Sequence, residues 1–207
     1  MRIALNSLQS FPSENSSNEI STSQYWLMPN IENSESLTVR EFGISKCVEA
    51  ARKIFPPEVI YNWIDCPVET RLKLAENYSL AVADAFELKD FKGIFIEDTG
   101  FGVAGFNNGD GKIHVNELLV NNRNETPFEV IDTIVHEMRH QYQSECMRGL
   151  HPLDHTVLQE WLVADQMYTN EQPYALAPWG YKYNALELDA RYAGETVIRE
   201  FTKDYRA

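Results

Sequence analysis

The segment that most constrains the fold is 128–142, FEVIDTIVHEMRHQY, in which apolar residues recur at steps of three and four. This spacing places them along one face of an α-helix. We expect the helix to have Thr126 as its N-cap, with Glu129 as capping-box partner, and to run to about Arg148, before Gly149. The apolar face comprises Val130, Ile131, Ile134, Val135, Met138 and Tyr142.

Two histidines lie four residues apart on this helix, His136 and His140. Their imidazoles therefore project from one side, at a separation that one metal ion can bridge. Glu137 follows the first histidine and lies about 100° further round the helix, within reach of a metal-bound water. The HExxH order predicts two imidazole ligands and a carboxylate that acts as general base. The alternative is an ordinary helix with no metal, since three fixed letters also match by chance.

The rest of the chain predicts a mostly helical α+β fold with a small sheet or hairpin before the HExxH helix. The segments 93–97 and 112–116 have strand patterns, and we expect them to pair as a hairpin. The run NGDG within 107–111 indicates a tight turn, and a calcium loop is the weaker alternative because the spaced acids of an EF-hand are missing. Further helices are expected at 36–55, 67–88, 155–168 and 184–201.

The charge balance narrows the possible partners. Lysine and arginine total 18 against 31 acidic residues, which gives a net charge of −13. This argues against nucleic-acid binding and against anionic membrane surfaces. Cys47, Cys66 and Cys146 have no CxxC spacing, so we expect free thiols in a reducing compartment. No signal peptide or membrane span is recognised, and we expect a cytoplasmic protein, although signal-free export would leave no trace. The oligomeric state stays open.

The segment KIHVN at 112–116, a loop, and VIDTIVHEMRHQYQ at 130–143 together resemble the strand–helix core of zincin metallopeptidases. The resemblance covers roughly residues 91–195. It implies a single zincin-like metallopeptidase domain over residues 36–207, after a partly extended leader at 1–35. It also implies that an edge strand lies across the cleft above the HExxH helix and aligns an extended peptide substrate.

A catalytic zinc generally has three protein ligands and an open position. The metzincin extension HExxHxxGxxH is excluded, because Gln143 and Cys146 stand where it needs glycine and histidine. A glutamate from a later helix, as in gluzincins, is therefore expected.

Two glutamates compete for this role. Glu160 lies twenty residues after the second histidine, as in thermolysin-like enzymes, but Gln159 replaces their asparagine and the following aspartate comes one residue late. Glu187 lies in YNALELDARYA, which resembles an N-P-x-E-x-D-A-R pattern downstream of HExxH in small bacterial and phage metallopeptidases. Ala185 stands where that pattern has proline. We prefer Glu187, also because a carboxylate beside an apolar helix face is costly to bury unless it is paired or binds a metal.

Other polar residues receive supporting roles. Asp189, a third possible ligand, is expected to bond a ligand histidine and fix its tautomer. Tyr183, His155 and Arg139 are possible donors to the oxyanion, and Tyr183, one turn before Glu187, is our candidate.

The predicted function is that of a zinc-dependent hydrolase, foremost a metallopeptidase acting on a peptide or protein. Zn²⁺ would be held by His136, His140 and Glu187, and its bound water would have a pKa of about 7. Glu137 would take the proton of that water and pass it to the leaving amine. Two alternatives remain: an acidic protein-interaction module with a structural HExxH helix, and a zinc amidohydrolase or toxin-like enzyme with a non-peptide or single-protein target.

Overall fold

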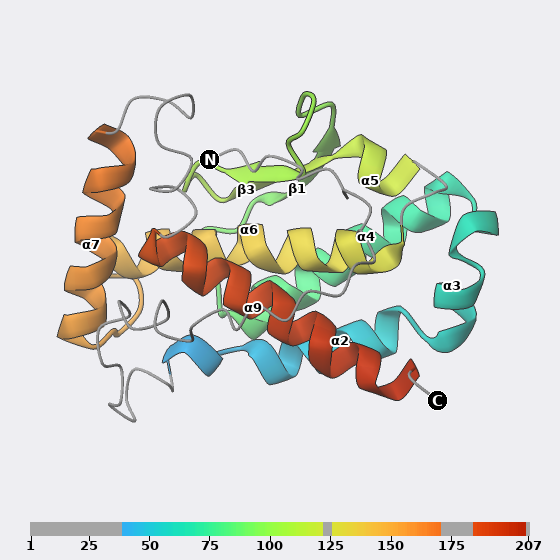
Figure 1. The fold of residues 1–207 in the computed structure, drawn as a ribbon, viewed down its shortest axis with the longest axis horizontal. Coiled ribbons are helices and arrows are strands. Elements are labelled where there is room, and N and C mark those ends of the chain that lie inside the picture. Colours follow the sequence, from blue (N-terminus) through green and yellow to red (C-terminus); the bar gives the residue numbers. More distant parts are fainter. Residues whose placement is uncertain (1–38, 122–125, 171–183, 206–207) are drawn as a thin grey trace, which may run out of the picture.

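The computed structural model of the chain describes residues 39–121, 126–170 and 184–205. The predicted leader at 1–35 and Tyr183 lie outside these ranges. The fold is α+β, mostly helical with one small sheet, as expected (Figure 1). The assignment of 36–207 to one domain stays a prediction.

The HExxH helix, α6 (Pro127–Met147), runs through the middle of the molecule. The sheet lies on one side of it, and α9 (Ala185–Thr202) crosses it on another (Figure 1). It also packs against α4 (Val68–Ala85) and α7 (His155–Asn170). Of its 21 residues, 16 are buried. The helix is therefore covered nearly all round, and its polar side chains must find partners inside the protein.

The sheet formed by the described residues has three strands in the order β1-β3-β2. β1 (Gly93–Glu97) runs parallel to β3 (Lys112–Asn116), so the predicted hairpin between these two segments is wrong. β2 (Gly105–Asn107) pairs antiparallel with β3, and it is this pair that forms the hairpin. Consequently β3 is the central strand, and β2 is an edge strand of the described sheet.

The segment 107–111 between β2 and β3 forms the tight turn that was predicted. The side chain of Asn107 accepts a hydrogen bond from the backbone N–H of Gly109, and that of Asp110 accepts one from Lys112. Gly109 and Gly111 have φ of 73° and 89°, a left-handed region that glycine adopts without strain.

Two predicted helices differ at their ends. Within the described part of 36–55, Gly43, at φ 79°, interrupts the helix, and α2 (Ile44–Ile54) begins after it. A side chain at Gly43 would collide with the ring of Phe86 at 2.6 Å. α4 ends at Ala85 rather than Leu88. The remaining predicted helices agree within about two residues.

Short elements escaped prediction: α3 (Pro57–Tyr61), α5 (Glu117–Asn121) and the 3₁₀ segments Trp63–Asp65 and Lys203–Tyr205. Thr126 is the N-cap of α6, but its side chain makes no capping bond, so the predicted capping box is wrong. The helix instead begins with Pro127, whose missing N–H needs no partner.

Cys47, Cys66 and Cys146 are free thiols, as expected. Within the described ranges, no helix has both the length and the apolar character needed to cross a membrane.

Candidate metal centre

Three buried side chains that suit a metal ion meet between α6 and α9: His136, His140 and Glu187. The two Nε2 atoms are 3.0 Å apart. Glu187 Oε1 lies 3.3 Å from His140 Nε2, and Oε2 lies 3.6 Å from His136 Nε2. Ligand atoms at the corners of a zinc tetrahedron, with bonds of about 2.0–2.1 Å, are roughly 3.3 Å apart. Each of the three separations is therefore close to such an edge, although the two distances to Glu187 end on different oxygens of its carboxylate.

The N-terminal end of α9 is held in place so that Glu187 lies beside the two histidines. Asn184 caps the helix by accepting the backbone N–H of Leu186, and its amide also donates to the carbonyl of Ala164 in α7. Further along, Gly194 faces α6 so closely that a Cβ there would lie 2.2 Å from an oxygen of Asp132. A capped start and a glycine contact thus hold α9 against α6, with Glu187 in the first turn.

Glu137 is fully buried in α6, directly after His136. Neither of its carboxylate oxygens has a hydrogen-bond partner among the residues that the structure describes, whereas those of Glu187 face the imidazoles of His140 and His136 at 3.3 and 3.6 Å. Buried carboxylates without partners are costly, and a bound cation removes that cost. The donor set of two imidazoles and a carboxylate, beside a second carboxylate, therefore fits a divalent metal ion.

The ionisation of these groups follows from burial and mutual charge. Burial lowers the pKa of His136 to about 4 and raises that of Glu137 to about 8. Burial also acts against the charged forms of His140 and Glu187. Their opposite charges outweigh it, so the pKa of His140 is raised and that of Glu187 is lowered. Without a metal, the proton on His140 therefore takes the place of the cation and balances the carboxylate of Glu187.

The second ring nitrogen of His140 points away from this group. Nδ1 lies 2.8 Å from Oε1 of Gln143. Gln143 Nε2 in turn donates to Asp189 Oδ2 at 2.7 Å. The prediction that Asp189 bonds a ligand histidine is wrong, because the amide of Gln143 stands between them.

Arg139 does not provide an oxyanion donor. It is fully buried, and its guanidinium donates hydrogen bonds to both oxygens of Asp189, at 2.7 and 3.1 Å. Its remaining bonds go to the carbonyls of Val39 and Phe42. These bonds commit its polar face to structure.

Two other predicted residues, Glu160 and His155, are not members of the three-residue group. Glu160 is half-buried on α7. His155 is exposed at the first residue of α7. Tyr183 lies outside the described residues.

His114 lies on the opposite face of β3 from its strand neighbours Ile113 and Val115, which are buried. Its ring stacks between Phe95 and Phe106, with ring centroids 5.5 and 4.2 Å away. It therefore belongs to the sheet face opposite the core.

Strand β2 passes directly beside Glu137. A Cβ added to Gly105 would lie 2.9 Å from Thr133 Cγ2 and 3.2 Å from Glu137 Cγ. It would also lie 2.7 Å from the backbone carbonyl of His114 on β3. Only glycine lets the edge strand lie this close to the HExxH helix.

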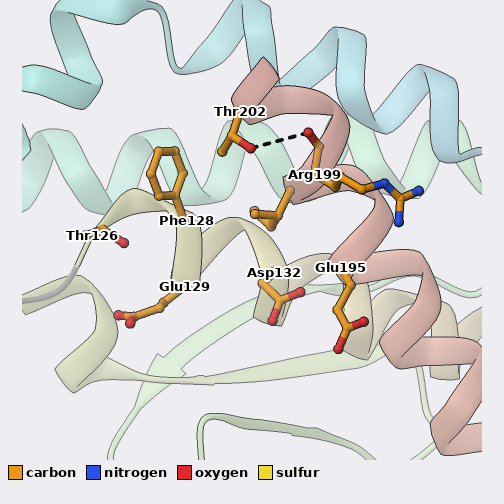
Figure 2. Close-up of a pocket in the computed structure, with 8 residues that line it drawn as sticks. Thr126, Phe128, Glu129, Asp132, Glu195, Arg199 and Thr202 are labelled. Carbon is orange, nitrogen blue, oxygen red and sulfur yellow. Dashed lines mark hydrogen bonds between the residues drawn. The ribbon is translucent and has the colours of Figure 1, made fainter. Parts of the chain in front are cut away.

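A separate hollow of about 390 Å³ lies between the first turns of α6 and the last turns of α9 (Figure 2). Asp132, one turn before His136, lies on its wall, and burial together with the charge of Glu195 raises the pKa of Asp132 to about 6. None of the three candidate ligands, His136, His140 and Glu187, lines this hollow. Its other lining residues are Thr126, Phe128, Glu129, Ile198, Arg199 and Thr202.

Two residues of the site were not anticipated. Gln143 lies three residues after His140, so helix geometry alone places both side chains on one face. Gly105 lies between the two segments with strand patterns, where no strand was predicted. Its role depends on the packing of the sheet on α6, for which the sequence carries no local signal.

The chain was also compared with protein families, with curated proteins and with solved structures, and none of the three comparisons found a match.

Proposed function

We propose that the chain is a zinc-dependent hydrolase of the zincin type, acting on peptide bonds. The observation that carries the proposal is the buried group of His136, His140 and Glu187, together with the buried carboxylate of Glu137, which has no hydrogen-bond partner in the described part of the chain. Two histidines and a glutamate form one of the known ligand sets of catalytic zinc, whereas calcium and magnesium prefer oxygen ligands alone. A purely structural helix would not account for the two buried oxygens of Glu137, which have no hydrogen-bond partner among the described residues.

A zinc ion bound by these three residues would acidify a water ligand to a pKa of about 7 and polarise the substrate carbonyl. Glu137 is a further buried carboxylate, on the same helix and between the two histidines in sequence. Its pKa of about 8 in the metal-free protein falls when a cation is near, because a positive charge favours the carboxylate. The carboxylate then accepts the proton of the attacking water and delivers it to the leaving amine.

The edge strand β2 supports a peptide as substrate. The N–H of Asn116 donates to the carbonyl of Ala104 at 2.7 Å, which makes these two residues a hydrogen-bonded pair. In an antiparallel ladder such pairs alternate with pairs that are not hydrogen-bonded, so Gly105 and Val115, the next pair, do not bond each other. The N–H and C=O of Gly105 accordingly point to the outer edge, beside Glu137. An extended peptide that adds to this edge would place a carbonyl close to the general base.

The experiment is to follow cleavage of an unstructured protein such as casein by zinc-loaded wild type and by Glu137→Gln. We expect hydrolysis by the wild type, loss of at least about a hundredfold in the variant, and equal zinc content in both. The matched control is Glu160→Gln, which removes a half-buried glutamate outside the group and should retain activity. Full activity in Glu137→Gln would remove this residue from the role of base.

A further inference from the structure

We infer that Gln143 is a positioning residue for two of the three candidate ligands. It sets the ring orientation and tautomer of His140, and it fixes the position of Glu187 relative to His140. The inference rests on the proposed metal site. Gln143 is buried, and its side chain makes three hydrogen bonds of 3.0 Å or less, to His140 Nδ1, Asp189 Oδ2 and the carbonyl of Leu186.

The direction of each bond in this chain is dictated by the previous one. The guanidinium of Arg139 can only donate, and it holds both oxygens of Asp189 as acceptors. Asp189 can therefore accept from Gln143 only through the amide NH₂, which faces Oδ2 at 2.7 Å. The amide oxygen is then left for His140.

An amide oxygen accepts and cannot donate, so His140 Nδ1 must carry the proton. In the neutral ring this leaves Nε2, the atom 3.3 Å from Glu187 Oε1, with its lone pair free for a metal that displaces the proton of the metal-free state. The buried Arg139–Asp189 pair thus selects the metal-binding tautomer of His140 through a neutral amide. A hydrophobic residue at position 143 would leave the ring free to rotate or to exchange its proton.

The same amide also holds the first turn of α9. Gln143 Nε2 donates to the carbonyl of Leu186 at 3.0 Å, and Leu186 directly precedes Glu187. Asp189 follows Glu187 by two residues. Gln143 therefore contacts α9 on both sides of the glutamate ligand, and it couples the position of this ligand to that of His140.

The test measures zinc affinity by competition with a chromophoric chelator at constant pH for wild type, Gln143→Met and Gln141→Met. Gln141 is the matched control, because it is the same residue type, fully buried on the same helix, with bonds to Asn107, Gly111 and Glu145 instead of the site. We expect zinc affinity to fall about 10- to 100-fold in Gln143→Met and to stay unchanged in Gln141→Met. Unfolding midpoints of the metal-free variants report any general loss of stability.

A second readout needs no stable variant at position 143. In zinc-loaded, ¹⁵N-histidine-labelled wild type, the ring resonances of His140, assigned by their loss in His140→Gln, should show a proton on Nδ1 and coordination through Nε2. Coordination through Nδ1 would overturn the inference, as would an unchanged affinity in Gln143→Met while the wild type binds zinc. A wild type that binds no zinc would overturn the proposed function and the inference together.

Discussion

Replacing Glu137 with glutamine should change the pH dependence of stability in the metal-free protein. Glu137 is fully buried and has no hydrogen-bond partner among the described residues. Burial raises its pKa from 4.5 to about 8, because the charged form loses its hydration. In the unfolded chain the carboxyl ionises at its ordinary pKa. The folded state therefore binds more protons than the unfolded state between these two values, and stability falls as pH rises through this interval.

The magnitude follows from the two pKa values of Glu137. Each pH unit between them corresponds to about 1.4 kcal/mol, so the free energy of unfolding should fall by roughly 3 kcal/mol between pH 5 and pH 7.5. Glutamine has the same shape and does not ionise, so this contribution is missing in Glu137→Gln. The neighbouring histidines titrate in both proteins, and their contributions largely cancel in the difference.

The assay is urea unfolding of wild type and Glu137→Gln in the presence of a chelator, from pH 5 to pH 9. The variant should gain stability relative to wild type as pH rises, and the gain should level off above about pH 8. With saturating zinc, which favours the carboxylate, the gain should shrink or change sign. A difference that is constant with pH, or that favours the wild type at high pH, would refute the claim that Glu137 is buried as an unpartnered acid.

Three further substitutions test the surroundings of the site. Gly105→Ala places a methyl group 2.7 Å from a backbone carbonyl and against Glu137, so it should cost about 1–3 kcal/mol by urea unfolding and lower the rate of the proposed hydrolysis. Asp132→Asn removes a carboxyl whose pKa burial and Glu195 raise to about 6; calorimetry should show it about 1–2 kcal/mol more stable than wild type at pH 7, allowing for solvent screening, and equal below pH 4. Glu145→Gln should lose about 2–3 kcal/mol in urea unfolding, because an NH₂ group replaces an oxygen that accepts two hydrogen bonds.

Local patterns predicted the helices well because they report burial along one element at a time. The apolar steps of 128–142 located α6, and the spacing of His136 and His140 already placed both rings on one side. Glu187 was preferred on a resemblance and on the cost of burying a carboxylate, and it lies beside both histidines.

What failed depends on contacts between elements. The direction in which β1 and β3 pair is decided by the path of the chain between them, and the three residues of β2 are too few to show alternation. The bond between Gln143 and Asp189 joins residues 46 positions apart, so it follows from the packing of α6 on α9. Arg139 was considered as a free donor because its partner on α9 could not be recognised from sequence spacing.

The most direct test of the account is the metal content of the purified chain, measured after loading with zinc at neutral pH and desalting. Wild type should hold about one zinc per chain, Glu160→Ala should hold the same, and His140→Ala and Glu187→Ala should lose most of it. Zinc retained in Glu187→Ala but lost in Glu160→Ala would contradict the assignment of the third ligand. No zinc in the wild type would contradict the metal centre itself, and the acidic interaction module would then be the better account of this chain.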